Sequence, residues 1–217
     1  MAFPYPLCVI TDEKLSGLRH REVAEQALQG ATPMIQLRDK GGDLRYLYEE
    51  ACAIRELCRR QGAVFIVNDR IDLAVGVEAD GVHLGQDDLP PHLARPLLTP
   101  GMLLGISTHS VEEAQEAEAA GADYIGFGPV FPTGTKRQPR PVVGLDGVRR
   151  ARAVVRVPIL AIGGITLERA PEVIAAGADG VAVISAIVGS REIAAACRHF
   201  LSRIHEGLGG KGVDTRS

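Results

Sequence analysis

The sequence predicts an α/β fold, a single-domain (β/α)8 TIM barrel, and two patterns support this prediction. Short apolar runs rich in β-branched residues alternate with longer runs of helix formers, which is typical of a parallel sheet covered by helices. About eight such units follow one another, which is the number that closes a barrel. The chain has 217 residues, a length that α/β barrels reach without dividing into two domains.

The expected strands are short and almost wholly apolar, as in sheets that are covered on both faces. Between them, segments such as 110–121 and 167–177 have acidic first turns and a closing glycine, which are signals of helix ends. A doubly wound open sheet is the alternative, but the Gly-rich fingerprint that such folds carry after the first strand is missing. The eight strands are expected at residues 7–11, 34–37, 64–67, 81–84, 103–106, 124–128, 158–162 and 180–184.

An internal repeat also favours a barrel of successive similar units. The segments EADGVHLG, GADYIGFG and GADGVAVI each place an alanine–aspartate pair directly before an expected strand. The pairs begin at Ala79, Ala122 and Ala178. We expect the barrel to span residues 1–206, and the glycine-rich, charged segment 207–217 to be a disordered tail.

Composition narrows the class of protein. The net charge of −3 gives no reason to expect nucleic acid or a membrane surface as a partner. No apolar run approaches the roughly 18 residues of a membrane span, and the first residues do not have the pattern of a signal peptide. The four cysteines show no metal-ligand spacing, so buried, reduced thiols are expected. Together these features predict a cytoplasmic protein.

Polar residues follow nearly every expected strand, where the βα loops of a barrel carry its chemistry. Arg38 and Lys40 follow the second strand, and Lys136 lies in the loop GPVFPTGTK after the sixth. An arginine fork together with lysine ammonium groups suits a diphosphate. The alternative for the segment LRDK alone is a solvated loop with a surface ion pair.

Carboxylates follow the third and fourth strands. Neighbouring loops would present Asp69 and Asp88 at the barrel mouth, and two carboxylates with phosphate oxygens and waters commonly hold Mg²⁺. Each aspartate could instead cap the helix that follows it, and Asp87 competes with Asp88 for a metal role. Asn68 could donate its amide to a substrate or tie the loop.

The last two strands end in a pattern that suits a phosphate monoester. Gly163 and Gly164 would let the backbone approach a ligand, and Ser185 with the amides after it could face an anion at a helix start. The alternative is that the glycines only form a tight turn. The barrel mouth is therefore expected to hold two phosphorylated ligands.

The motifs IQLRDK, NDRIDLAVGVEADGVHLGQDDLP, GISTHS, GFGPVFPTGTK, AIGGI and GVAVISAI resemble those of the thiamine phosphate synthase family. The resemblance extends through about residue 193 and keeps every motif in order. It implies an Mg²⁺-dependent transferase that joins 4-amino-5-hydroxymethyl-2-methylpyrimidine diphosphate to 4-methyl-5-(2-phosphoethyl)thiazole. The products would be thiamine phosphate and pyrophosphate, and a homodimer is left open.

The resemblance also implies roles for single residues. Arg38, Lys40 and Lys136 would be catalytic, and Asp69 and Asp88 would bind the metal. The pyrimidine diphosphate would contact Gln36, Arg38, Lys40, Asn68, Ser107 and Lys136, and the thiazole phosphate would contact Thr133, Thr135, Gly164, Ile184 and Ser185. One departure is Gln138, which stands where the family often has an acidic residue.

Two other classes of function are less consistent with the sequence. A thiazole tautomerase on the same scaffold would carry a histidine where this chain has Pro129, and a non-catalytic phosphate-binding regulator would not need both the cations and the carboxylates. Two histidines could suggest acid–base catalysis. We expect His83 to line the barrel and His109 to belong to a helix-capping region, so neither is predicted to be catalytic.

Overall fold

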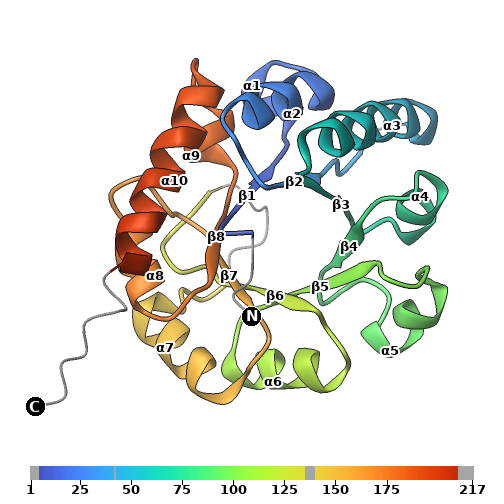
Figure 1. Cartoon of the computed structure of the whole chain (residues 1–217). Coiled ribbons are helices and arrows are strands. Elements are labelled where there is room, and N and C mark those ends of the chain that lie inside the picture. The colour runs from blue at the N-terminus through green and yellow to red at the C-terminus, as the bar shows by residue number, and fades with distance from the viewer. Residues whose placement is uncertain (1–4, 42, 135–139, 210–217) are drawn as a thin grey trace, which may run out of the picture.

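A computed structural model shows a closed barrel of eight parallel strands in the order of the sequence, with β1 paired to both β2 and β8. The structure describes residues 5–41, 43–134 and 140–209. The view along the barrel shows the strands in a central ring with the helices outside it (Figure 1). The (β/α)8 fold predicted from the sequence is confirmed.

All eight predicted strands are present, and their ends differ from the prediction by at most two residues. The largest difference is at the fifth strand, which continues to Thr108. The strands are β1 (Leu7–Ile10), β2 (Met34–Leu37), β3 (Val64–Asn68), β4 (Gly81–Leu84), β5 (Leu103–Thr108), β6 (Tyr124–Phe127), β7 (Ile159–Ile162) and β8 (Gly180–Val183).

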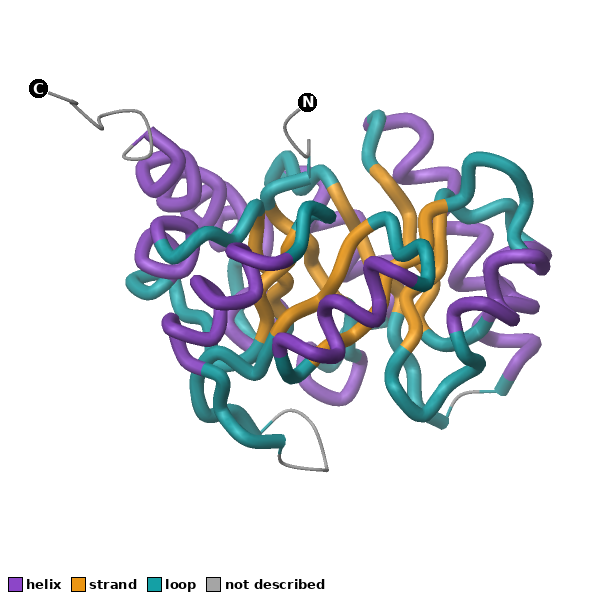
Figure 2. Tube along the Cα trace, turned by 90° about the horizontal axis from the view of Figure 1, so that it is seen from below, coloured by secondary structure: helices purple, strands orange, loops and turns teal. Residues whose placement is uncertain are grey.

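The helices surround the strands, as the tube in Figure 2 shows from the side. In chain order they are α1 (Glu13–Ser16), α2 (His20–Gln29), α3 (Leu44–Gln61), α4 (Ile71–Gly76), α5 (Pro91–Ala94), the 3-10 turn η1 (Arg95–Leu97), α6 (Val111–Ala119), α7 (Gly144–Val154), α8 (Ala170–Ala175), α9 (Ser185–Val188) and α10 (Ile193–Gly209).

The last helix corrects one boundary. Helix α10 packs against α8 and α2 and continues through Gly209. Residues 207–209, which we assigned to a disordered tail, are therefore helical, because the apolar face of α10 still packs on the barrel at Leu208. Residues 210–217 lie outside the described residues.

The barrel interior is filled by side chains. Tyr124 is fully buried there among Cys8, Ile66 and Leu160. Its ring lies where a side chain at Gly105 would lie, because a Cβ atom on Gly105 would be 2.2 Å from the Tyr124 ring. The interior is thus a packed core, as is usual for barrels of this size, and ligands are confined to one end of the strands. A larger apolar layer fills the space between strands and helices.

The repeated alanine–aspartate pairs have a structural role at the amino-terminal ends of the strands. The Asp179 carboxylate accepts a hydrogen bond of 2.8 Å from the Ile159 amide at the start of β7 and one of 2.8 Å from Arg152 in α7. In return, the Asp179 amide donates to the Ile159 carbonyl. One aspartate therefore joins the start of β8 to the start of β7 and to the helix before it.

The other two pairs make the same contacts. Asp80 accepts from the Phe65 amide of β3 at 2.8 Å and from Arg55 of α3 at 3.0 Å. Asp123 accepts from the Leu104 amide of β5 and from an arginine of η1, both at 2.7 Å. We call these three aspartates, Asp80, Asp123 and Asp179, the strand-start carboxylates.

The described residues contain no helix that is both long and apolar enough to cross a membrane. The four cysteines are free, and three of them are buried. Burial raises the pKa of the Cys58 thiol to about 12 and that of Cys197 to about 11. These thiols therefore behave as small apolar side chains.

Replacing a strand-start carboxylate should destabilise the protein. We expect Asp179→Ala to lower the free energy of unfolding by about 2 kcal/mol, because the Ile159 amide loses a charged hydrogen-bond acceptor. Urea titration followed by circular dichroism measures the change. Asp146→Ala is the control, since Asp146 is 80% exposed and its ion-pair partner among the described residues is Arg149 of the same helix. Its change should stay below about 0.5 kcal/mol, and equal effects of both variants would contradict the role of Asp179.

Candidate functional site

Two adjoining pockets open where the strands end and the βα loops begin. A larger polar pocket of about 560 Å³ lies over the ends of β2, β3, β4 and β5. A smaller, more apolar pocket of about 230 Å³ lies over β5 to β8. Ser107, His109 and Arg140 line both pockets. Two ligands bound in these pockets would therefore meet beside Ser107.

The two predicted cations of the second loop line the polar pocket. Arg38 lies 3.4 Å from the Asp12 carboxylate, with its side chain 15% exposed, and the Lys40 ammonium pairs with Asp69. The loop LRDK therefore does form ion pairs, as the alternative interpretation expected, but these ion pairs lie in the wall of the polar pocket. Both cations therefore line the polar pocket together with their carboxylate partners.

The two predicted carboxylates face each other at the same pocket. Asp69 has a left-handed backbone with φ of 63°, a conformation that is uncommon outside glycine and is often found at functional sites. Asp88 accepts a 2.6 Å hydrogen bond from the Gly85 amide. Burial raises the pKa of the Asp88 carboxyl, and the neighbouring Asp69 carboxylate adds to the rise, whereas the Gly85 amide and Lys40 oppose it.

The alternatives for these carboxylates can now be compared with the structure. In the described part of the chain, neither α4 nor α5 receives a side-chain cap, because the residues before them are Arg70 and Pro90. Asp87 also lines the polar pocket, but it is 88% exposed and lies 3.7 Å from Arg140, whereas Asp88 interacts with Asp69. Asp88 is therefore the aspartate of this pair that approaches Asp69.

The smaller pocket is lined by four of the residues that we assigned to the thiazole phosphate, namely Thr133, Gly164, Ile184 and Ser185. The tight-turn alternative also has support at Gly164. This residue has φ of 62°, and a Cβ atom there would lie 2.5 Å from the Pro132 carbonyl oxygen. The glycine is thus required by the close approach of the β6 and β7 loops, which also shapes the pocket.

The two histidines have the positions expected from the sequence. His83 lines the barrel, with Nδ1 at 3.1 Å from the Tyr124 hydroxyl and Nε2 at 2.9 Å from the Ser107 hydroxyl. His109 lies just before α6, and both its amide and its Nδ1 contact the Glu113 carboxylate. His83 is therefore part of a chain of polar groups that holds Ser107 in place.

Not every predicted residue reaches a pocket. Gln36 is buried in β2 and does not line either pocket in the part of the chain that the structure describes. Asn68 lines the polar pocket, and its buried Nδ2 has no hydrogen-bond acceptor among the described residues. An unsatisfied donor of this kind suits a ligand oxygen. Thr135, Lys136 and Gln138 lie outside the described residues.

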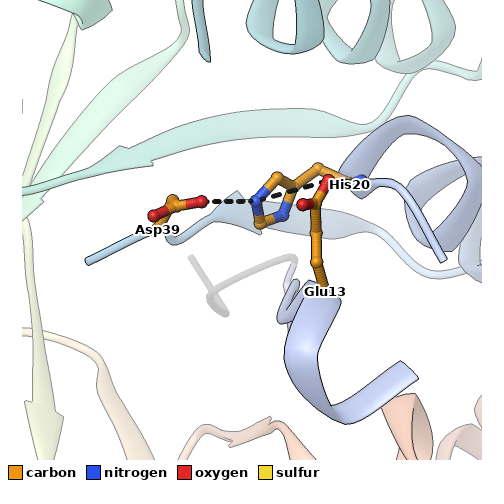
Figure 3. Close-up of side chains that lie close together, drawn as sticks. All are labelled: Glu13, His20 and Asp39. Carbon is orange, nitrogen blue, oxygen red and sulfur yellow. Dashed lines mark hydrogen bonds and ion pairs between the residues drawn. The ribbon is translucent and has the colours of Figure 1, made fainter. Parts of the chain in front are cut away.

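The sequence analysis missed a cluster at the rim of the polar pocket. Glu13, His20 and Asp39 offer ligand atoms that all lie within 4.8 Å of one another, and Figure 3 shows the imidazole between the two carboxylates. Asp39 lies inside the segment LRDK, in which only Arg38 and Lys40 were predicted to bind a ligand. Because these residues come from three separate segments, no local pattern pointed to the cluster.

Known proteins resemble this chain closely. The model of the family described as thiamine monophosphate synthase matches residues 7–187. A thiamine-phosphate synthase of Methanocella arvoryzae is 52% identical over 203 residues, covering 93% of this chain and 96% of the relative. That of Methanospirillum hungatei is 53% identical over 195 residues, covering 89% of this chain and 95% of the relative.

A solved structure agrees with the sequence comparisons. The thiamine phosphate pyrophosphorylase of Pyrococcus furiosus superposes with a TM-score of 0.88 at 41% identity, covering 94% of this chain and 98% of that protein. These matches extend over the whole barrel and both pockets. The chain belongs to the thiamine monophosphate synthase family.

Proposed function

We propose that this chain is the transferase that the resemblance implied: it joins 4-amino-5-hydroxymethyl-2-methylpyrimidine diphosphate to 4-methyl-5-(2-phosphoethyl)thiazole. The products are thiamine phosphate and pyrophosphate. The observation that carries the proposal is the pair of adjoining pockets, one charged and one apolar, that share Ser107. The relatives, which are named as synthases, do not favour the tautomerase alternative.

The chemistry of each pocket suggests which substrate it holds. Arg38, Lys40 and Asn68 line the polar pocket, and an arginine, an ammonium and an amide donor suit the oxygens of a diphosphate. The smaller pocket combines an apolar lining with Thr133 and Ser185, which suits a heterocycle that carries one phosphate. The further roles of Gln36, Thr135 and Lys136 rest on the family resemblance.

Asp69 and Asp88 are the residues proposed to hold Mg²⁺. Their carboxylates approach each other closely enough that Asp69 raises the pKa of Asp88, and a divalent cation with oxygen ligands would relieve this repulsion. Mg²⁺ bound there would neutralise negative charge on the diphosphate. The donor set therefore fits the cofactor expected from the sequence.

The reaction needs stabilisation of charge more than proton transfer. In the proposed dissociative mechanism the bond between the pyrimidine methylene carbon and the diphosphate oxygen breaks first, and the aminopyrimidine stabilises the resulting cation. Arg38, Lys40 and Lys136 would bind the departing pyrophosphate, as preorganised positive charges do. The thiazole nitrogen then forms the new carbon–nitrogen bond and has no proton to lose, so the site requires no general base.

Placement of the thiazole phosphate next to the pyrimidine would also increase the rate of the reaction. The phosphate held near Thr133 and Ser185 would anchor the thiazole, and the ring would extend towards Ser107, where the pockets meet. Holding two reactants next to each other removes much of the entropic cost of their encounter. The cytoplasmic location and the homodimer considered from the sequence stay predictions.

The proposed activity can be tested directly with purified protein. Incubation with both heterocyclic phosphates and Mg²⁺ should produce thiamine phosphate and pyrophosphate in equal amounts, measured by liquid chromatography. Adding a chelator in excess should stop the reaction, and restoring Mg²⁺ should restart it. Omission of either substrate is the control. Failure to form thiamine phosphate with the metal present would contradict the proposal.

The adjacent aspartates provide a matched pair of variants for the metal site. Asp88→Asn should lower the Mg²⁺-dependent rate by about 100-fold or more, because one charged oxygen ligand becomes a neutral amide. It should also raise the Mg²⁺ concentration needed for the half-maximal rate. Asp87→Asn should change neither quantity more than about twofold, since Asp87 faces solvent. The opposite result would assign the metal to Asp87.

Lys136 allows a test of leaving-group stabilisation. Lys136→Ala should lower kcat by about 100-fold to 1000-fold, because the variant lacks one of the positive charges that stabilise the negatively charged pyrophosphate as it departs. The circular dichroism spectrum and the unfolding midpoint should stay unchanged. Arg137→Ala is the control for loss of a neighbouring charge. An unchanged kcat for Lys136→Ala would show that this lysine does not act on the leaving group.

A further inference from the structure

We propose that His20 is a positioning residue that fixes the loop carrying Arg38 and Lys40, and so forms the diphosphate subsite without touching the substrate. This inference deepens the proposed function and rests on it. His20 was not among the residues predicted from the sequence or implied by the family resemblance. It begins α2, and its side chain is only 1% exposed although it lies beside a polar pocket.

Four contacts to three residues fix the His20 side chain and backbone. Its Nδ1 lies 2.7 Å from the Thr11 hydroxyl at the end of β1. Its Nε2 lies 3.3 Å from the Asp39 carboxylate and 3.9 Å from that of Glu13. Its amide donates to the same Glu13 carboxylate at 3.0 Å. The imidazole therefore links β1, α1 and the loop after β2, as Figure 3 shows for the two carboxylates.

The partners determine the direction of these hydrogen bonds. Carboxylates only accept, so Nε2 of His20 carries the hydrogen that faces Asp39 and Glu13. In the neutral imidazole, Nδ1 then accepts from the Thr11 hydroxyl, and the same hydroxyl oxygen accepts the Arg38 amide at 3.3 Å. A continuous series of hydrogen bonds thus runs from the Arg38 amide through Thr11 and His20 to the Asp39 carboxylate.

This series holds the cation-bearing loop at two points. The Arg38 amide is held through Thr11, and the next side chain, Asp39, is held by the imidazole. The other oxygen of Asp39 accepts the Gly41 amide at 2.6 Å, which closes the turn just after Lys40. The backbone from Arg38 to Gly41 is therefore anchored on both sides of Lys40, and a preorganised loop binds an anion without the cost of ordering it.

The same cluster could also be considered as a metal site, because its three ligand atoms lie within 4.8 Å of one another. Its groups already have protein partners, however. Glu13 accepts from the Tyr46 hydroxyl and from the His20 amide, and Asp39 accepts from Gly41. Since a metal would have to displace the hydrogen on Nε2, the hydrogen-bonded arrangement accounts for the cluster better.

Three substitutions at His20 separate positioning from general structural support. His20→Ala removes every side-chain contact. His20→Gln places an amide near the former Nε2 and can still donate to Asp39, whereas His20→Asn reaches only the position of Nδ1. We expect His20→Ala and His20→Asn to raise the KM for the pyrimidine diphosphate about 10-fold to 100-fold, as misplacement of binding groups does. His20→Gln should restore KM to within about threefold of the unchanged protein.

The readouts are chosen so that a loss of folding cannot imitate the effect. The KM for the thiazole phosphate should stay within about twofold in all three variants, because its pocket does not include the anchored loop. Calorimetric titration with inorganic pyrophosphate and Mg²⁺ should show a Kd raised by a similar factor in His20→Ala. His205→Ala, at an exposed site of α10, is the matched control and should change nothing.

A double-mutant cycle completes the test. Asp39→Ala should reproduce the effect of His20→Ala, and the double variant should be no worse than either single one, because both remove the same anchor. If His20→Ala does not fold, Asp39→Ala and His20→Gln still decide the question. Three results would overturn the proposal: equal changes in the KM for the pyrimidine diphosphate and the KM for the thiazole phosphate, failure of His20→Gln to restore KM, or a double variant whose change in KM is the product of the two single changes. An inactive unchanged protein would instead contradict the proposed function.

Discussion

The starts of the strands are the constraint on which the rest of this molecule depends. Most strands have only four residues, so a misplaced start would leave few ladder hydrogen bonds in register. The strand-start carboxylates fix the starts of three strands. Each joins the beginning of one strand to an amide of the preceding strand and to an arginine. A charged acceptor for a buried amide is stronger than a neutral one. These contacts fix the starts of β4, β6 and β8 against the strands before them, and the pairing of β1 with β8 closes the barrel.

The opposite end of the barrel has a different balance of charges. There Arg38 pairs with Asp12, Lys40 pairs with Asp69, and Asp88 approaches Asp69. At the strand starts each carboxylate accepts hydrogen bonds from a backbone amide and from an arginine. At the pockets, opposite charges share partners that a diphosphate and a divalent cation could replace. The same types of side chain therefore stabilise the fold at one end and prepare for ligands at the other.

Much of the fold was predictable because its signal is local. Each strand is a short apolar run between helix signals, and the ends found in the structure differ from the prediction by two residues or fewer. The boundary at residue 206 was wrong because glycine composition suggested a tail, whereas packing of Leu208 extends α10 to Gly209. The alanine–aspartate pairs were visible in the sequence, but their arginine partners come from other segments and were not.

The candidate site was predictable to the extent that its residues follow strand ends. Arg38, Lys40, Asp69 and Asp88 follow neighbouring parallel strands and therefore line the same pocket. The residues alone did not separate Asp87 from Asp88, because adjacent residues in a loop point in directions that spacing does not determine. The family resemblance implied Asp88, and in the structure Asp88 is close enough to Asp69 for that carboxylate to raise its pKa. His20 was not predicted as a site residue because its contacts are not visible in the local sequence. It contacts Thr11 and Asp39, which are distant in sequence from it and from each other.

The packed interior beneath the pockets has a consequence for the traffic of ligands. Tyr124 fills the space above Gly105 inside the strands, so there is no passage through the middle of the barrel. Substrates and products would therefore enter and leave at the end of the strands where both pockets open. The Tyr124 ring is also linked through His83 to Ser107, so the packed core extends up to the point where the two pockets meet.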